Sequence, residues 1–169
     1  VVPTDVNGYP LAIPYSDGVN PPQIVRTIML DVEAGTYPTG TYTLIFEGDG
    51  EIQLGRSGSG TYTSTGAQRT VSFTVTNNTS GISLAISRST AGNPIRNVNV
   101  VMPGHLSTYT TQPFYPPLLA RLQGFSVIRF MEWIRTNGQR RLVNWSDRPT
   151  TAYVTHAGPY GGAYEYAIR

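Results

Sequence analysis

Apolar residues recur at every second position in two segments of the chain, and few structures other than a β-sheet accommodate this pattern. Successive side chains of a strand point to opposite faces, so each segment predicts a strand with one buried face. The segments are residues 41–47 and 69–76, and their apolar sets are Tyr42, Leu44, Phe46 and Val71, Phe73, Val75.

Strand signals recur at short intervals, with turn-forming sequences between them. They occur at residues 24–30, 41–47, 51–54, 61–64, 69–76, 81–87 and 97–102. The run Gly48-Asp49-Gly50 predicts a tight hairpin turn, because Asp-Gly accepts the positive φ angles that such turns need. Short strands at this spacing, without helical periodicity, predict a mainly β protein with a jelly-roll-type antiparallel β-sandwich.

The pattern changes after residue 104. Two prolines before residues 118–122 predict a short helix, which Gly124 would end. The continuous apolar run 125–131 predicts a strand that is buried on both faces. Residues 162–169 look like the first turns of another helix. A strand, a long loop and a helix in this order form one incomplete β/α unit.

These patterns divide the chain into four parts. We expect an N-terminal arm that lies on the sheet, a β-sandwich, a connector with a short helix, and a partial β/α unit of a second domain. Their predicted bounds are residues 1–23, 24–104, 105–124 and 125–169.

Composition narrows the classes of function. The chain has no cysteine, which excludes disulfides and thiolate metal sites. Its net charge of +2, carried by arginine without lysine, does not predict nucleic-acid binding. No apolar run approaches the roughly 18–20 residues of a membrane span. Low charge together with abundant Thr, Tyr and Gly favours a secreted or cell-surface protein.

Both tryptophans fall between residues 125 and 148, together with arginines, acids and asparagines. Tryptophan rings stack on the apolar faces of sugars, and polar side chains of these types hydrogen-bond ring hydroxyls. We therefore predict a ligand-binding site that uses Arg129, Trp133, Asn137, Trp145, Asp147 and Arg148. The alternative is that both tryptophans pack against the end of the sandwich.

Catalytic and metal roles have weaker support in the sequence. Glu132 or Asp147 could be one half of a glycosidase acid pair, but no second carboxylate lies at a matching strand end. We therefore predict no catalytic residue within residues 1–169. A calcium site is a further possibility, although its four acids lack a recognised loop spacing. Those acids are Asp31, Glu33, Asp49 and Glu51.

The order of several motifs resembles the N-terminal part of large secreted bacterial proteins associated with polysaccharides. The matching segments are residues 40–52, 93–104, 125–133, 136–137 and 144–149. In such proteins a carbohydrate-binding-like β-sandwich precedes a barrel similar to glycoside hydrolases. The resemblance implies that residues 125–169 begin such a barrel, with Trp133, Asn137, Trp145, Asp147 and Arg148 on its loop face.

Three functions remain open at this stage. The first is a carbohydrate-binding or accessory segment of an extracellular protein, with a polysaccharide as its partner. The second is the N-terminal part of a glycoside hydrolase, whose second acid would be supplied by residues outside this sequence. The third is a structural subunit of an extracellular filament, surface layer or adhesin, which implies self-assembly.

Overall fold

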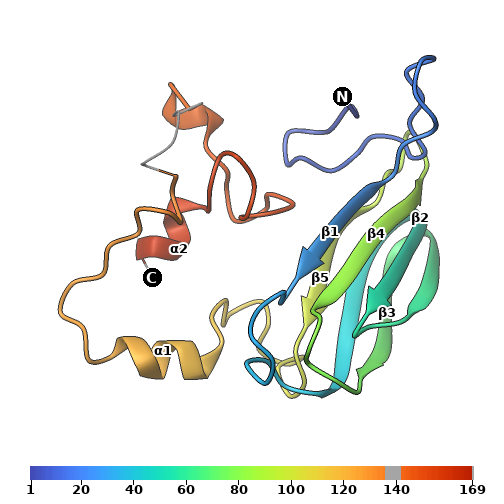
Figure 1. Ribbon diagram of the computed structural model, residues 1–169. Helices are drawn as coiled ribbons and strands as arrows, with labels where there is room; N and C mark the ends of the chain where they lie inside the picture. Colours follow the sequence, from blue (N-terminus) through green and yellow to red (C-terminus); the bar gives the residue numbers. More distant parts are fainter. Residues whose placement is uncertain (136–141, 169) are drawn as a thin grey trace. The chain divides into compact units, whose positions relative to one another are not determined.

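The computed structural model describes residues 1–135 and 142–168, and it divides into two compact units. Unit 1 comprises Val1–Asp5 and Tyr9–Leu106, and unit 2 comprises Val6–Gly8 and Ser107–Arg169. The β-strands belong to unit 1, whereas the described part of unit 2 contains helices and irregular segments (Figure 1). The predicted mainly β, antiparallel fold is confirmed.

Unit 1 is built on one antiparallel sheet. Its strands are β1 (Val25–Met29), β2 (Gly40–Arg56), β3 (Gly60–Val75), β4 (Ile82–Ser89) and β5 (Arg96–Val101). The strand order is β1-β4-β2-β3. One edge of β2 pairs with β3 along its length, while its other edge is shared by β5 and then β4. All five strands belong to one sheet, so the finer jelly-roll topology is not confirmed.

The hairpin turn predicted at Gly48-Asp49-Gly50 is wrong, because β2 continues through these residues. The pairing of β2 with each of its three neighbours shifts register close to this point, which is the mark of β-bulges. Gly48 has a φ of 96°, and a Cβ added there would overlap the carbonyl oxygen of Pro94. A Cβ on Gly50 would overlap the carbonyl oxygen of Arg88. The glycines therefore allow a bend and a close backbone approach within one long strand.

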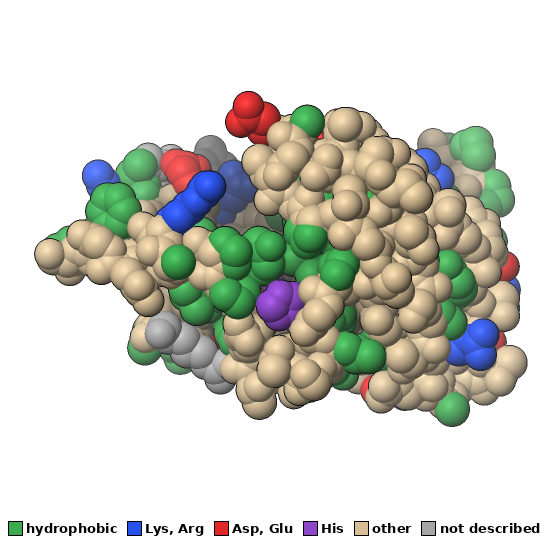
Figure 2. All heavy atoms as spheres, turned by 90° about the horizontal axis from the view of Figure 1, so that it is seen from below, with side chains coloured by type: hydrophobic (Ala, Val, Ile, Leu, Met, Phe, Trp, Pro, Cys, Tyr) green, Lys and Arg blue, Asp and Glu red, His purple; other side chains and the backbone are tan. Residues whose placement is uncertain are grey.

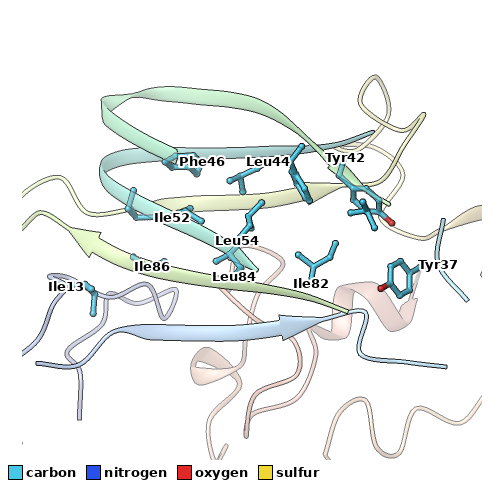
Figure 3. Packing of buried hydrophobic residues seen from close by; sticks show 13 residues of the cluster. Ile13, Tyr37, Tyr42, Leu44, Phe46, Ile52, Leu54, Ile82, Leu84 and Ile86 are labelled. Carbon is cyan, nitrogen blue, oxygen red and sulfur yellow. The ribbon is translucent and has the colours of Figure 1, made fainter. Parts of the chain in front are cut away.

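The bend lets both halves of β2 contribute to one hydrophobic core (Figure 3). Tyr42 and Phe46 come from the first half, and Ile52 from the second, and all three are fully buried. The Tyr42 ring also contacts the ring of Phe73 on β3, with centroids 5.7 Å apart. The predicted core positions of the two segments are thereby confirmed, although each segment belongs to a longer strand than predicted. Thr43 and Ile45 are buried as well, so this part of β2 is buried on both faces and not on one.

The N-terminal arm lies on the sheet, as predicted. The Ile13 N–H donates to the Ser89 carbonyl (2.9 Å), and the Ser89 N–H donates to the Ile13 carbonyl (3.0 Å). The Ile13 side chain is buried in the core. The Ser89 hydroxyl in turn accepts the Ile95 N–H (2.9 Å). The arm thus completes the core at the end of β4.

Unit 2 contains little regular structure. Its elements are helix α1 (Pro116–Leu122), the 3-10 turn η1 (Trp145–Asp147) and helix α2 (Tyr164–Ile168). The predicted proline-started helix is α1, and the predicted C-terminal helix is α2, so both are confirmed. None of the residues of α1 is buried. Within the described ranges, no helix has the length and hydropathy needed to span a membrane.

The strand predicted over residues 125–131 is wrong. The segment is irregular. Phe125, Val127 and Ile128 are exposed, with Phe125 at 66% and Val127 at 84% of full exposure, while Phe130 and Met131 are half-buried. A strand buried on both faces needs neighbouring strands, and the described residues of unit 2 provide none. Hydrophobic side chains at the surface are also visible in the space-filling view (Figure 2).

Candidate functional site

The five predicted binding residues that the structure describes do not form one cluster. Trp133 and Trp145 lie in two different aromatic groups, and Asp147 and Arg148 lie with Trp145. Arg129 is exposed on the irregular segment that was predicted to be a strand. Asn137 lies outside the described residues, so its predicted role stays a prediction.

Trp133 is surrounded by aromatic rings and by a glycine backbone. Its ring centroid lies 6.4 Å from that of Phe114 and 6.3 Å from that of Phe130, in tilted and edge-on arrangements. The Gly162 N–H donates to the Trp133 carbonyl (2.7 Å), and a Cβ built on Gly162 would overlap the indole. These contacts are typical of a packing residue, although 38% of Trp133 remains exposed.

The Trp133 group continues through α2. Tyr166 makes edge-on contacts with Phe114 (5.9 Å between centroids) and with His156 (5.1 Å). The Ala163 N–H, just before α2, donates to His156 Nδ1 (3.3 Å). Burial lowers the pKa of the His156 imidazole, which favours its neutral form. We call Phe114, Phe130, Trp133, His156 and Tyr166 the aromatic core of unit 2.

Trp145 has a different environment. It begins η1, and 63% of its surface is exposed. The Arg148 guanidinium carbon lies 4.1 Å from the Trp145 ring centroid, a cation–π contact. The Tyr164 ring of α2 lies 5.3 Å away at an angle of 55°. The indole is therefore held by two neighbours while most of it faces solvent.

Arg148 is fixed by α2 as well as by η1. Its Nη2 donates to Glu165 Oε1 at 2.6 Å, and its Nη1 donates to the Trp145 carbonyl at 3.3 Å. Hydrogen bonding from the backbone N–H of Glu165, and then from Arg148, holds the pKa of the Glu165 carboxyl below its usual value. The Nε atom of Arg148 and the Oε2 atom of Glu165 are buried without a hydrogen-bond partner among the described residues.

Asp147 is positioned by its own turn. Its carboxylate accepts a hydrogen bond from the Asn144 amide (3.0 Å) and another from the Ser146 hydroxyl (3.0 Å). All three side chains are exposed at η1, next to Trp145. We call Asn144, Trp145, Ser146, Asp147 and Arg148 the Trp145 site.

Glu132, the other acid considered for catalysis, lies beside Trp133 in an exposed turn. Its backbone carbonyl accepts the Arg135 N–H at 3.3 Å. It lies 13 positions before Trp145 in the chain.

Three of the four acids considered for calcium contact other side chains of unit 1. Asp31 forms an ion pair with Arg56 (3.2 Å), and Asp49 forms one with Arg88 (3.0 Å). Glu51 accepts the Ser87 hydroxyl (2.7 Å) on its carboxylate, and the fourth acid is Glu33. Within the described ranges, no group of three or more acids or histidines is arranged to hold a metal ion.

The sequence analysis did not identify the α2 residues that organise both groups. Tyr164 and Tyr166 contact the two tryptophan environments, and Glu165 holds Arg148. An ion pair across 17 positions, between an irregular segment and a five-residue helix, leaves no periodic signal. The alternation of aromatic and acidic residues in Tyr164-Glu165-Tyr166 was the only available hint.

Comparisons with protein-family models, with curated proteins and with solved structures find no match to this chain.

Proposed function

We propose that the chain is a carbohydrate-binding segment of an extracellular, polysaccharide-associated protein, and that the Trp145 site is where the glycan binds. The observation that carries this proposal is the exposed indole of Trp145, which is held in a fixed position beside polar side chains. Stacking on a sugar ring requires an accessible, oriented aromatic surface, and Trp145 has 63% of its surface in solvent.

The ion pair between Arg148 and Glu165 supports the proposal because it fixes the site before ligand arrives. The Arg148 guanidinium contacts the Trp145 indole and is itself held by Glu165 at 2.6 Å. A site ordered in this way loses less conformational entropy on binding. The amide of Asn144 and the carboxylate of Asp147 are the groups that would hydrogen-bond sugar hydroxyls next to the indole.

Trp133 has a different role in this proposal. It was predicted as a second stacking residue, but its contacts with Phe114, Phe130 and Gly162 favour a packing role. One exposed tryptophan and a few polar neighbours correspond to a weak single site. Retention on an insoluble polymer, where many sites are available, is therefore the appropriate assay.

The experiment compares retention of the 169-residue chain on insoluble cellulose, xylan, chitin and peptidoglycan. Trp145→Ala should lose retention on the polymer that the unchanged chain binds, by about tenfold or more, because it removes the stacking surface. The matched control is Phe125→Ala, which removes an aromatic ring of similar exposure (66%) that lies outside the Trp145 site. The fluorescence of Trp133 reports whether unit 2 stays folded.

Two results would contradict the proposal in different ways. Retention of the Trp145→Ala variant at the level of the unchanged chain would refute the site. Absence of retention on every polymer tested, with unit 2 folded, would refute carbohydrate binding by this chain.

A further inference from the structure

Strand β3 has one long edge that no other strand covers. In the part of the chain that the structure describes, β3 pairs with β2 alone, and it is the last strand in the order β1-β4-β2-β3. The backbone hydrogen bonds outside the sheet ladders do not involve Gly60–Val75. Next to the bulge, the Ser64 hydroxyl donates to the Ala67 carbonyl and accepts the Gly66 N–H. Elsewhere along this 16-residue strand a row of backbone N–H and C=O groups remains open.

This edge lacks the features that normally keep sheets from pairing edge to edge. Such features are short length, lysine, proline and inward-pointing charge. Strand β3 is long, contains no lysine or proline, and has Arg69 as its single charged residue. Its one protective feature is the register shift beside Arg69, where Ala67 and Gln68 lie opposite Glu47 alone. The other end strand of the order, β1, has only five residues.

The residues after this bulge are self-complementary. In order they are Thr, Val, Ser, Phe and Thr, so the pattern of polar and apolar positions reads the same in both directions from Ser72. When two such strands pair antiparallel about a two-fold axis, each polar position lies opposite a polar one and each apolar position opposite an apolar one. We propose that two copies of this chain associate through β3, with Ser72 of one copy opposite Ser72 of the other.

This register aligns the faces of the two sheets. Val71 lies opposite Phe73 of the second copy, and both belong to the inner face that packs on the core. Thr70 lies opposite Thr74 of the second copy, and both are exposed on the outer face, as Ser72 is. A shift by one residue would instead place inner residues opposite outer ones, so the pairing is specified by the pattern.

The charges also permit the pairing. Arg69 lies opposite the apolar Val75 of the second copy, and six residues separate the two Arg69 positions along the strand direction. At the rise of a β-strand this is about 20 Å. That separation exceeds the Debye length of roughly 8 Å at physiological ionic strength, so the two arginines do not repel one another appreciably.

The test is sedimentation velocity of the 169-residue chain across a dilution series from micromolar to near-millimolar protein, without any glycan. We expect a concentration-dependent dimer for the unchanged chain. Ser72→Lys puts two ammonium groups directly opposite each other and should raise the dimer Kd by about tenfold or more. Ser72→Glu should do the same. An equimolar mixture of the two variants should restore the dimer, because each lysine then faces a glutamate.

Thr63→Lys is the matched control. Thr63 is exposed on the same strand on the other side of the bulge, so its charge should leave the dimer Kd within about threefold. A chain that stays monomeric at the highest concentration overturns the proposal. If Thr63→Lys dissociates the dimer while Ser72→Lys leaves it intact, the proposed register is wrong. If the mixture of Ser72→Lys and Ser72→Glu does not associate, the two Ser72 positions do not lie directly opposite each other. None of these results depends on the Trp145 site, which lies in unit 2.

Discussion

Replacing Gly162 by alanine tests whether the Trp133 indole is a packing element. A Cβ built on Gly162 would lie 2.6 Å from Cδ1 and 2.7 Å from Cε2 of Trp133, and closer still to Nε1. Ordinary contacts between such atoms begin at about 3.4 Å, so the indole must move by roughly 1 Å or more. The backbone cannot move freely instead, because the Gly162 N–H is bonded to the Trp133 carbonyl.

The expected cost follows from what the displaced ring loses. Forcing an extra methyl group into a packed site costs about 1–3 kcal/mol. Weakening the ring contacts with Phe114 and Phe130 adds about 0.5–1.5 kcal/mol for each pair that is lost. With both pairs lost, we therefore expect Gly162→Ala to reduce the unfolding free energy of unit 2 by about 2–6 kcal/mol.

Tryptophan fluorescence during urea unfolding measures this change selectively. The chain has two tryptophans, and both belong to unit 2, so the signal reports that unit. Gly158→Ala is the matched control in the same loop. Its Cβ would meet nothing nearer than Thr155 Cγ2 at 3.6 Å, and we expect a change within about 0.5 kcal/mol. Equal unfolding midpoints for the two variants would refute the packing role of Trp133.

Three further predictions concern other parts of the molecule. Gly48→Ala should destabilise unit 1 by about 3 kcal/mol or more and Gly92→Ala by about 1 kcal/mol, as measured by far-ultraviolet circular dichroism in denaturant. Both glycines have positive φ, but only the first would meet backbone atoms, so equal effects would contradict the proposed bend. The stability of unit 2 should fall as the pH drops below 6.5. The reason is that burial lowers the pKa of His156 in the folded state, so that protonation favours unfolding. A His156→Gln variant should lose this pH dependence in fluorescence-monitored unfolding. Glu165→Gln should lower the unfolding midpoint of unit 2 at pH 7 and have little effect well below pH 4.5. The Glu165 backbone N–H and then Arg148 stabilise the carboxylate and lower its pKa, and this stabilisation is lost as the acid protonates. An effect of equal size at both pH values would show that charge is not its cause.

The sheet was predictable where one face of a strand meets the core. The period of two in residues 41–47 and 69–76 placed Tyr42, Leu44, Phe46, Phe73 and Val75 correctly, because side chains on the core face of a strand recur at every second position regardless of what pairs with the strand. It did not predict that Thr43 and Ile45 on the other face of β2 are buried too. The arm and the proline-started helix were also predictable, since both depend on local composition.

Long-range pairing explains the errors. The sequence Gly48-Asp49-Gly50 satisfies the local rule for a hairpin turn, yet the backbone at Pro94 approaches it closely and β2 continues through it. No local pattern specifies which distant segment will lie there. The apolar run 125–131 was read as a buried strand for a related reason, because apolarity indicates burial but does not supply neighbouring strands.

The two tryptophans show why closeness in sequence did not predict a shared site. Helix α2 has five residues, and Tyr164 and Tyr166 are separated by about 200° around its axis, so they face opposite sides. Tyr164 contacts Trp145, while Tyr166 belongs to the aromatic core that includes Trp133.

Glu165 lies between these two tyrosines and holds Arg148, which contacts the Trp145 indole. The aromatic core therefore fixes α2, and α2 in turn fixes the Trp145 site. It follows that Gly162→Ala should weaken glycan retention even though Gly162 lies outside the Trp145 site. Because this effect acts through folding, lowering the temperature should restore retention in Gly162→Ala, whereas it should not restore retention in Trp145→Ala. Equal recovery of both variants on cooling would mean that Trp145 also acts through stability and does not contact the glycan.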